Sequence, residues 1–366
     1  MAFQSRGHPV LLSNGGTIHA AGKVPWRYAK NSSDLRRNSR VGKLTDGVTA
    51  QQPKSHTVFH HHNNTIRRNL FLLLRLTGIP FFLREFVQRE KVTILCYHDM
   101  DPQLAEQHIR LLKRLYNFIP LRAYIDTRRA KVTTTLPRKA LVITFDDGHK
   151  GNYGLLPVFR RYQVPATIFL CSSIVGTHRH YWWKACPNLA NAHALKLLDN
   201  DERLQCLAES GFQENRKYVE RQSLSREEIK ELRGFVDLQS HSRYHPILPR
   251  CTDDQSWEEI AGSKTELEKI FGLGIYAFAY PNGDYSPRET MLANKAGYTC
   301  ALTIDGGYNT LDTDMFRLRR LRVDDEADLN ELIVKASGLW SFFEKILKRG
   351  RYIRDRVLNA TMSRAA

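Results

Sequence analysis

The sequence predicts an α/β domain of parallel βα units, arranged either as a barrel or as a doubly wound sheet. Short apolar runs typical of buried strands alternate with segments of helical periodicity that are roughly ten to twenty residues long. The composition, 42% hydrophobic and 25% charged over 366 residues, is that of a globular chain with a sizeable core. Several strand candidates end on carboxylates or histidines, and such strand ends are where sites form in parallel α/β domains.

The strand candidates are short runs rich in apolar and β-branched residues, bounded by polar or turn residues. They are residues 92–98, 140–145, 166–171, 235–240, 275–281 and 298–304, with 316–323 as a candidate seventh strand. This number of strands separated by helices favours parallel pairing over hairpins.

The helix candidates between these runs place apolar residues on one side. They are residues 102–118, 152–163, 225–234, 253–272 and 286–297, and a polar helical insertion covers 187–221. Ser225 with Glu228 forms a capping-box pattern, and Ser286 followed by Pro287 marks another helix start.

The positive charge lies in the flanks. Residues 1–90 hold fourteen Lys/Arg and four Asp/Glu, residues 344–366 hold seven and two, and only +2 of the net +17 is left for 91–343. A globular part with so little excess charge has no reason to attract phosphate backbones, and no zinc-finger, RRM or helix-turn-helix pattern occurs. We therefore expect no nucleic-acid partner.

The flanks divide into three further segments. Residues 1–66 are basic and without sustained periodicity, and we expect them to be disordered. Residues 67–90 form an apolar and basic helix, interrupted by Gly78 and Pro80 and too short to span a bilayer. This helix either packs on the domain or lies at a membrane interface, and the same two readings remain open for the basic helix or tail at 341–366.

The cysteines and the N-terminal residues bear on localisation. The six cysteines are scattered without a CxxC pair, which is typical of reduced thiols. The first thirty residues lack the apolar segment of a secretory signal. We therefore expect a cytoplasmic protein, with peripheral attachment to the inner face of the membrane left open.

Polar residues follow the strand candidates at the expected edge. His98 ends the first, "DDGH" (146–149) follows the second, "HSRYH" (241–245) follows the fourth and "YPNGD" (280–284) begins at the end of the fifth. Because the carboxyl ends of parallel strands meet at one edge, these side chains are expected to lie together.

Two adjacent aspartates at the end of an apolar strand are costly unless a positive group compensates them. Two histidines four residues apart can hold one ion, and with one carboxylate they form a three-ligand site with an open position, which suits Zn²⁺ or a similar metal. The second carboxylate is then free to act as a base. Taken singly, the aspartates have a plainer explanation as a helix cap and the histidines as surface residues. Together, in this order, they favour a hydrolytic metal site.

These motifs resemble those of the polysaccharide deacetylases with a NodB homology domain. "TFDDG" (144–148) is similar to the family's first motif, "HSRYH" (241–245) to its second and "AYPNG" (279–283) to its third, in the form of one bacterial branch. The opening "ILCYHDMD", "YWW" (181–183) and "FRLRRLRV" (316–323) are also like that branch. The resemblance covers roughly 91–340 and implies a distorted (β/α)7 barrel.

The resemblance also implies the roles of the motif residues. Asp146 is the expected general base, and Asp147, His241 and His245 are the expected metal ligands. The backbone N–H of Asn282 is expected to stabilise the oxyanion. The implied cofactor is a divalent ion, Zn²⁺ as first choice, with Co²⁺, Ni²⁺ and Mn²⁺ as alternatives.

This chain departs from the family pattern at two places. Ala279 stands where many members have an arginine that holds the base, and Arg320 is the candidate replacement. No histidine follows His245, although many members use a late histidine as the acid. His98 is the candidate substitute, with His149 behind it.

The sequence therefore predicts a hydrolase that removes acetyl groups from an N-acetylated sugar in a poly- or oligosaccharide, with a lipid-linked glycan left open. The expected substrate contacts are Tyr280, Pro281, Trp182 and Trp183. An O-acetyl esterase acting on a glycan and a non-catalytic glycan-binding protein of the same fold are the alternatives.

Overall fold

The computed structural model describes residues 56–130, 136–186 and 189–347. Most of the N-terminal tail expected at 1–66 and of the C-terminal segment expected at 341–366 lies outside these residues. Within them, α1 spans His56–Leu76, so helix begins before the expected boundary. Among the described helices, none has the length and apolar character needed to cross a bilayer.

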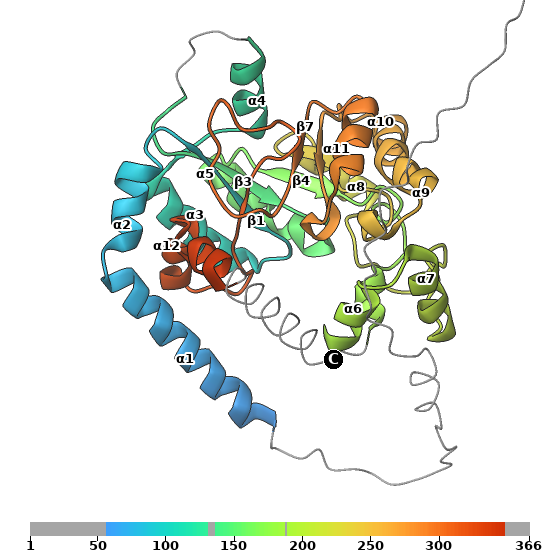
Figure 1. Cartoon of the computed structure of the whole chain (residues 1–366), viewed down its shortest axis with the longest axis horizontal. Coiled ribbons are helices and arrows are strands. Elements are labelled where there is room, and N and C mark those ends of the chain that lie inside the picture. Colours follow the sequence, from blue (N-terminus) through green and yellow to red (C-terminus); the bar gives the residue numbers. More distant parts are fainter. Residues whose placement is uncertain (1–55, 131–135, 187–188, 348–366) are drawn as a thin grey trace, which may run out of the picture. The chain divides into compact units, whose positions relative to one another are not determined.

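A parallel sheet forms the centre of the molecule (Figure 1). Seven of its eight strands follow in the order β7-β6-β5-β4-β3-β1-β8, and β2 pairs with β3 outside this path. The strands are β1 (Val92–Tyr97), β2 (Asn117–Phe118), β3 (Ala140–Phe145), β4 (Thr167–Leu170), β5 (Asp237–Ser240), β6 (Ala277–Ala279), β7 (Cys300–Leu302) and β8 (Leu321–Arg322).

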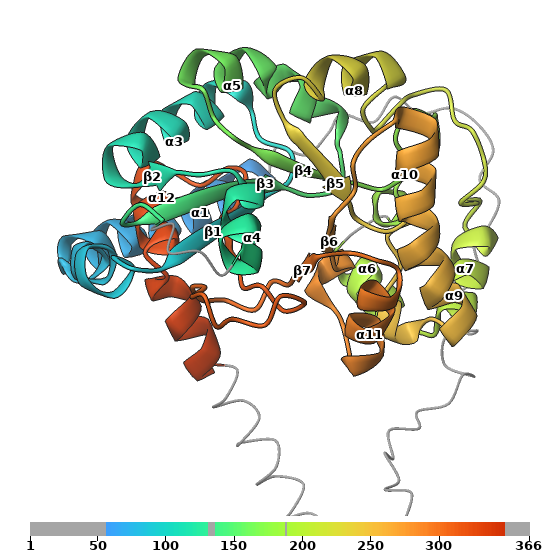
Figure 2. The same ribbon diagram turned by 90° about the horizontal axis from the view of Figure 1, so that it is seen from above.

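The two ends of this path are joined by the chain that leads into β8. Leu302 of β7 forms a parallel bridge with Leu318, and three residues later Leu321 pairs with Leu95 of β1. The sheet is therefore curled and nearly closed, as the view from above shows (Figure 2). The predicted distorted (β/α)7 barrel is confirmed.

Helices cover the outside of the sheet (Figure 2). The α-helices after α1 are α2 (Ile79–Phe82), α3 (Pro102–Leu115), α4 (Leu121–Ala130), α5 (Leu156–Tyr162), α6 (Leu189–Leu195), α7 (Asn200–Glu209), α8 (Arg226–Leu232), α9 (Asp253–Trp257), α10 (Ser263–Phe271), α11 (Pro287–Lys295) and α12 (Leu329–Ala336). Short π-helical segments lie at Leu83–Val87 and Glu258–Gly262, and 3-10 turns at Lys150–Leu155, Trp182–Ala185, Leu248–Arg250 and Pro281–Gly283. A further helical run covers 339–347.

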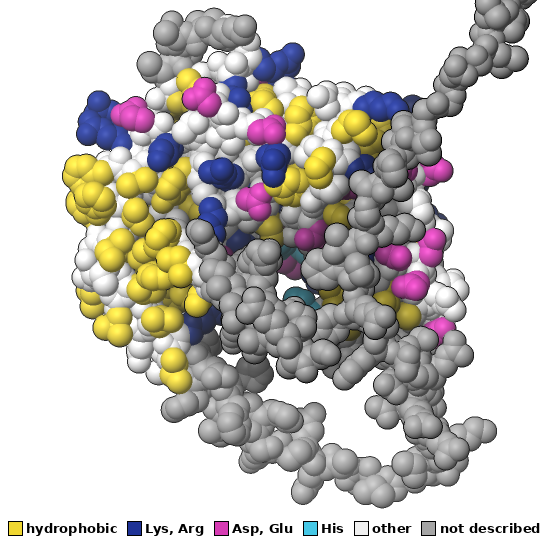
Figure 3. Space-filling model, in the orientation of Figure 1, with side chains coloured by type: hydrophobic (Ala, Val, Ile, Leu, Met, Phe, Trp, Pro, Cys, Tyr) yellow, Lys and Arg dark blue, Asp and Glu magenta, His cyan; other side chains and the backbone are white. Residues whose placement is uncertain are grey.

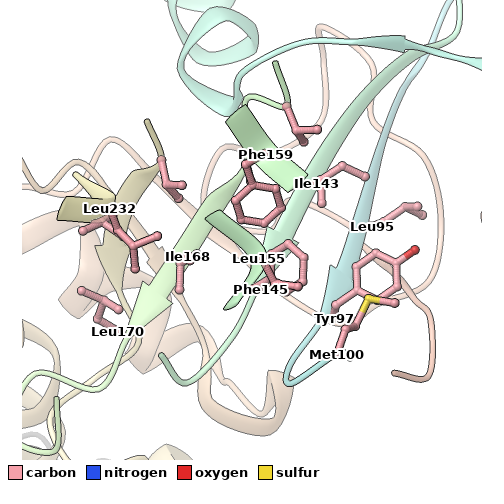
Figure 4. Packing of buried hydrophobic residues seen from close by; sticks show 14 of the residues in the cluster. Leu95, Tyr97, Met100, Ile143, Phe145, Leu155, Phe159, Ile168, Leu170 and Leu232 are labelled. Atoms are coloured by element: carbon pink, nitrogen blue, oxygen red, sulfur yellow. The ribbon is translucent and has the colours of Figure 1, made fainter. Parts of the chain in front are cut away.

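Alternate residues of β3 enter two different cores. In β3, Ile143 and Phe145 face the helices, where they pack with Phe159 of α5 (Figure 4). Val142 belongs to the other cluster, inside the curled sheet. Because side chains alternate along a strand, Asp146 continues the inward-facing row of this strand and lies at the mouth of the barrel.

Several element boundaries differ from the sequence prediction. The helix predicted over 102–118 ends at Leu115, because Tyr116 is extended and the Asn117 and Ile119 N–H groups donate to the Lys139 and Leu141 carbonyls, which makes Asn117–Phe118 a strand. In the insertion at 187–221, the described helices are α6 and α7. The predicted helix over 253–272 contains a π-helical segment, and helices α4 and α12 were not predicted.

Candidate active site and metal centre

A cavity of about 640 Å³ opens at the carboxyl ends of the strands. His98 lines it after β1, Asp146 and Asp147 after β3, His241 and His245 after β5, Asn282 after β6, Ile304 after β7 and Arg322 in β8. The cavity is further lined by Trp183 and Cys186 and, from the insertion, by Ala192, His193 and Lys196. The fold therefore gathers the polar strand ends as predicted from parallel pairing.

Asp147, His241 and His245 form a buried cluster with one free acceptor. Asp147 Oδ1 lies 3.4 Å from Nε2 of each histidine, and the three ligand atoms lie within 4.8 Å of one another. That oxygen has no hydrogen-bond partner among the described residues. A buried carboxylate oxygen without a donor is normally avoided. One carboxylate and two imidazoles are a fitting donor set for a divalent ion, which would satisfy this oxygen.

Neighbouring groups fix the orientation of these ligands. His241 Nδ1 lies 2.8 Å from the Ala279 carbonyl, which can only accept, so the proton sits on Nδ1 and the Nε2 lone pair faces the cluster. His149 Nε2 lies 3.0 Å from Asp147 Oδ2, which leaves Oδ1 free. Burial lowers the pKa of His245 to about 3, so its ring is neutral near neutral pH, as metal binding requires.

Asp146 is held by Arg320 in a buried, two-pronged ion pair. Arg320 Nη1 and Nη2 lie 2.7 and 2.8 Å from the two carboxylate oxygens, and Arg320 Nε donates to the Thr303 carbonyl. Burial raises the pKa of Asp146, but the positive charge of Arg320 outweighs it and lowers the pKa to about 2. Asp146 is therefore ionised at neutral pH, as a base must be.

The backbone of the first motif explains its glycine. Asp147 and Gly148 both have φ of 74°, in the left-handed region. A Cβ on Gly148 would lie 2.7 Å from Cδ2 of Leu170 in β4. Glycine is therefore required on both conformational and steric grounds, whereas Asp147 is a non-glycine residue in a strained conformation, as is common at functional sites.

Glu259 of the π-helical segment supports the loop that carries the two histidines. Its Oε2 accepts from the backbone N–H groups of Arg243 and Tyr244, at 2.8 and 2.9 Å. The Ser242 hydroxyl accepts from the His245 N–H at 3.0 Å. These bonds hold His245 at a φ of 60°, and π-helical turns often occur at such sites.

The cavity is also lined by a residue that was not predicted from the sequence. Lys196, at the end of α6, donates from Nζ to Asn282 Oδ1 at 2.6 Å. Asn282 Nδ2 is buried and has no partner among the described residues, and Asp284 lines the same cavity. Nothing in the sequence marks Lys196, because it lies in a polar insertion far from the three motifs.

The predicted substrate contacts need correction. Trp183 lines the cavity and its ring lies 4.4 Å from that of His245. Trp182, Tyr280 and Pro281 are buried and do not line it. Trp182 Nε1 instead donates to the His245 carbonyl at 2.9 Å, and the Tyr280 hydroxyl donates to the Phe316 carbonyl, so both support the structure of the site.

Of the two histidines considered as the acid, His98 and His149, only His98 lines the cavity. The backbone N–H of His98 is held by Asp325 at 2.9 Å. His149 is buried, bonds to Asp147 and does not line the cavity, so it is a positioning residue for that carboxylate. Asn282, expected to stabilise the oxyanion, lines the cavity with a φ of 54°.

The sequence profile of the polysaccharide deacetylases matches residues 133–301. A polysaccharide deacetylase of Bacillus subtilis, YxkH, is 27% identical over 186 residues, which is 50% of this chain and 52% of that protein. The poly-beta-1,6-N-acetyl-D-glucosamine N-deacetylase of Staphylococcus epidermidis is 23% identical over 57% of this chain and 62% of its own length. The chain thus spans less than two thirds of the length of these curated relatives.

Solved structures support the fold. The deacetylase PplD of Streptococcus pyogenes, solved with acetate, has a TM-score of 0.51 and 18% identity over 68% of this chain and 99% of its own. IcaB of Ammonifex degensii has a TM-score of 0.50 and 20% identity over 69% of this chain and 98% of its own. At such identities the likeness concerns the curled α/β barrel alone.

Proposed function

Because residues 133–301 match the polysaccharide deacetylase family, we propose that this chain is a hydrolase that removes acetyl groups from an N-acetylated sugar of a poly- or oligosaccharide. One observation carries the proposal. An ionised carboxylate, Asp146, lies beside a metal-ligand cluster in a single cavity, with His241 Nε2 3.9 Å from Asp146 Oδ2. A base next to a cation site is the arrangement that water-dependent amide cleavage requires.

Each residue of the site has its own role in the proposed reaction. Asp146 takes a proton from a water molecule whose oxygen attacks the acetyl carbonyl carbon. The negative charge that develops on the carbonyl oxygen is stabilised by the Asn282 N–H. A divalent ion held by Asp147, His241 and His245 would polarise that carbonyl and lower the pKa of the attacking water. The C–N bond then breaks, and acetate and the protonated amine leave.

Lys196 supplies the proton to the leaving amine in this proposal. Its Nζ donates to Asn282 Oδ1, and Lys196 lines the same cavity as Asp146. Burial lowers the pKa of Lys196, which makes its ammonium group a better acid than a free lysine. A lysine here accounts for the absence of a histidine after His245.

The Lys196→Met variant tests this role. It keeps the length and packing of the stem but removes the proton, so kcat for acetate release is expected to fall about 10²-fold or more. Because the protonated form is needed, wild-type activity is expected to decline as pH rises through the pKa of Lys196, below its ordinary 10.5. That alkaline decline should shift or disappear in the variant, and Lys196→Arg should restore the charge but little of the rate. A matched His98→Gln variant that loses the alkaline decline while Lys196→Met keeps it would assign the acid to His98.

Removal of the ion is expected to abolish turnover. Dialysis against a chelator should eliminate acetate release, and added Zn²⁺ should restore it, with Co²⁺, Ni²⁺ and Mn²⁺ compared in parallel. The His241→Ala variant should bind less metal by elemental analysis, because two ligands cannot replace three. Tyr280→Phe, which removes a buried hydroxyl outside the cavity, should retain the metal. Full activity of the chelated protein would contradict the proposed chemistry.

The substrate class is best tested with a glycan panel. The relative from Staphylococcus epidermidis is named for poly-beta-1,6-N-acetyl-D-glucosamine, so oligomers of β-linked N-acetylglucosamine are the first choice. Acetate release from O-acetylated but not N-acetylated sugars would indicate an esterase.

A non-catalytic glycan-binding protein is the second candidate, because no histidine follows His245. It requires metal content and glycan affinity without acetate release. The retention of both Asp146 and Asp147 favours catalysis, because a binding protein needs only one of them.

A further inference from the structure

Apolar side chains are concentrated on one surface outside the catalytic cavity. Of the nineteen large hydrophobic side chains that are exposed in the described residues, nine lie between 66 and 86 and three between 342 and 347. We call these twelve the apolar surface: Ile66, Leu70, Leu72, Leu73, Leu76, Ile79, Phe81, Phe82, Phe86, Phe342, Ile346 and Leu347. Figure 3 shows a dense group of hydrophobic side chains on the side of the molecule where Figure 1 places α1 and α2.

Helix α1 is apolar on both of its faces. On the inner face, Phe71 is buried against Val334 and Leu339, and Arg67 pairs with Asp324 and Glu331. The outer face carries Ile66, Leu70, Leu73 and Leu76, spaced three or four residues apart, with Leu73 64% and Leu76 71% exposed. A surface helix normally has a polar outer face, so this face has the composition of one that is covered.

The N- and C-terminal parts of the apolar surface are continuous. Ile79, Leu83 and Val87 line a groove of about 1000 Å³ together with Leu339, Phe342 and Phe343. The rings of Phe82 and Phe86, in the N-terminal part of the apolar surface, stack 5.0 Å apart. Segments more than 250 residues apart in sequence thus form a single surface.

The charge beside this surface is positive. Residues 66–90 and 339–347 hold six Lys/Arg against three Asp/Glu. The chain adjoining them, residues 1–55 and 348–366, holds fifteen against three. Among the described residues, Arg68 and Arg138 are 72% and 64% exposed. Basic residues beside an apolar face attract anionic lipid headgroups, each contributing about 1 kcal/mol near such a membrane.

We propose that the apolar surface binds the surface of an anionic lipid bilayer, with the outer face of α1 and the aromatic residues of 81–86 and 342 inserted at the level of the headgroups. An interfacial helix of this kind lies in the plane of the membrane and does not cross it. A bound bilayer would cover the exposed leucines and phenylalanines, and its anionic headgroups would attract the flanking basic residues. The proposal is independent of the catalytic activity.

Charge distinguishes this occupant from a second copy of the chain. Two copies facing each other through this surface would bring two positive flanks together, whereas an anionic bilayer attracts them. The difference predicts that binding depends on lipid charge and salt, and that the protein has no salt-resistant dimer.

The test is sedimentation of the full chain with vesicles of phosphatidylcholine alone or with phosphatidylglycerol. The double variant Leu73→Glu/Leu76→Glu places two carboxylates on the outer face of α1 without touching Phe71. Met291→Glu, on α11, is the matched control, because Met291 is also exposed, at 61%, but lies outside the apolar surface. Circular dichroism checks that each variant is folded, and Phe86→Ser is a second, milder variant of the same surface.

The wild type and Met291→Glu should bind anionic vesicles, less so at high salt or without anionic lipid. The double variant should bind about tenfold or more weakly. Equal binding by the folded double variant and the wild type, or no vesicle binding by the wild type, would overturn the proposal. A stable dimer in sedimentation equilibrium that the double variant abolishes would assign the surface to self-association instead.

Discussion

Asp146→Asn is expected to lower kcat for acetate release by about 10² to 10⁴-fold, because the amide cannot take a proton from water. The substitution preserves the size of the side chain and leaves Asp147, His241 and His245 in place. Metal content, measured by elemental analysis, should therefore remain near that of the wild type. The loss should appear in kcat more than in KM, since the role of Asp146 lies in the chemical step.

Two controls keep this result interpretable. Asp126→Asn makes the same chemical change at an exposed position of α4 and should leave activity unchanged. Asp146→Asn also leaves Arg320 with a neutral partner. Thermal unfolding of the variant must therefore be measured, to show that it is folded at the assay temperature. A folded, metal-loaded Asp146→Asn protein with wild-type activity would remove Asp146 from the role of base.

Arg320→Met is expected to destabilise the fold and to change the pH dependence of activity together. Arg320 is fully buried and bonds both oxygens of Asp146, so its loss leaves a buried carboxylate without its partner. Breaking a buried ion pair in this way costs about 3 to 5 kcal/mol of unfolding free energy. Arg320→Lys keeps the charge but cannot bond both carboxylate oxygens in the same geometry. Its stability should therefore lie between that of Arg320→Met and that of the wild type.

The pH dependence provides a second measurement. With Arg320 present, the pKa of Asp146 is lowered from 3.8 to about 2. The ionised Asp146 therefore stabilises the folded state fully above pH 3.8, and this contribution is lost as pH falls toward 2. Without Arg320, burial alone raises the pKa of Asp146, so the acid limb of the kcat/KM profile should move to higher pH. Guanidinium denaturation and a pH–rate profile measure the two effects. An unchanged acid limb in a folded variant would show that Arg320 does not tune the base.

The common location of the motifs could be predicted because the carboxyl ends of parallel strands lie at one edge of the sheet. Once residues 92–98, 140–145 and 235–240 are strands of one parallel array, Asp146, Asp147 and His241 must lie at a common edge. The alternation within β3 further determines that Asp146 faces inward. Strand composition and short motifs, which are local properties, were sufficient for this part.

Contacts between distant segments could not be predicted in the same way. Arg320 was only a candidate replacement for the missing motif arginine, and its pairing with Asp146, 174 residues away, depends on how the barrel closes through Leu318. Lys196 reaches Asn282 from an insertion without a motif. Trp182 and Tyr280 have the aromatic character of sugar contacts but are buried, because burial depends on what packs around a side chain.

The sequence by itself thus determined the strand-end chemistry of this protein: two adjacent carboxylates and two histidines on a parallel α/β scaffold. The tertiary structure decided which oxygen of Asp147 stays free, which cation holds Asp146 and which other groups line the cavity. The physical reason is that strand formation and side-chain alternation are set by residues close in sequence. Desolvation and ion pairing depend on side chains brought together only when the sheet closes.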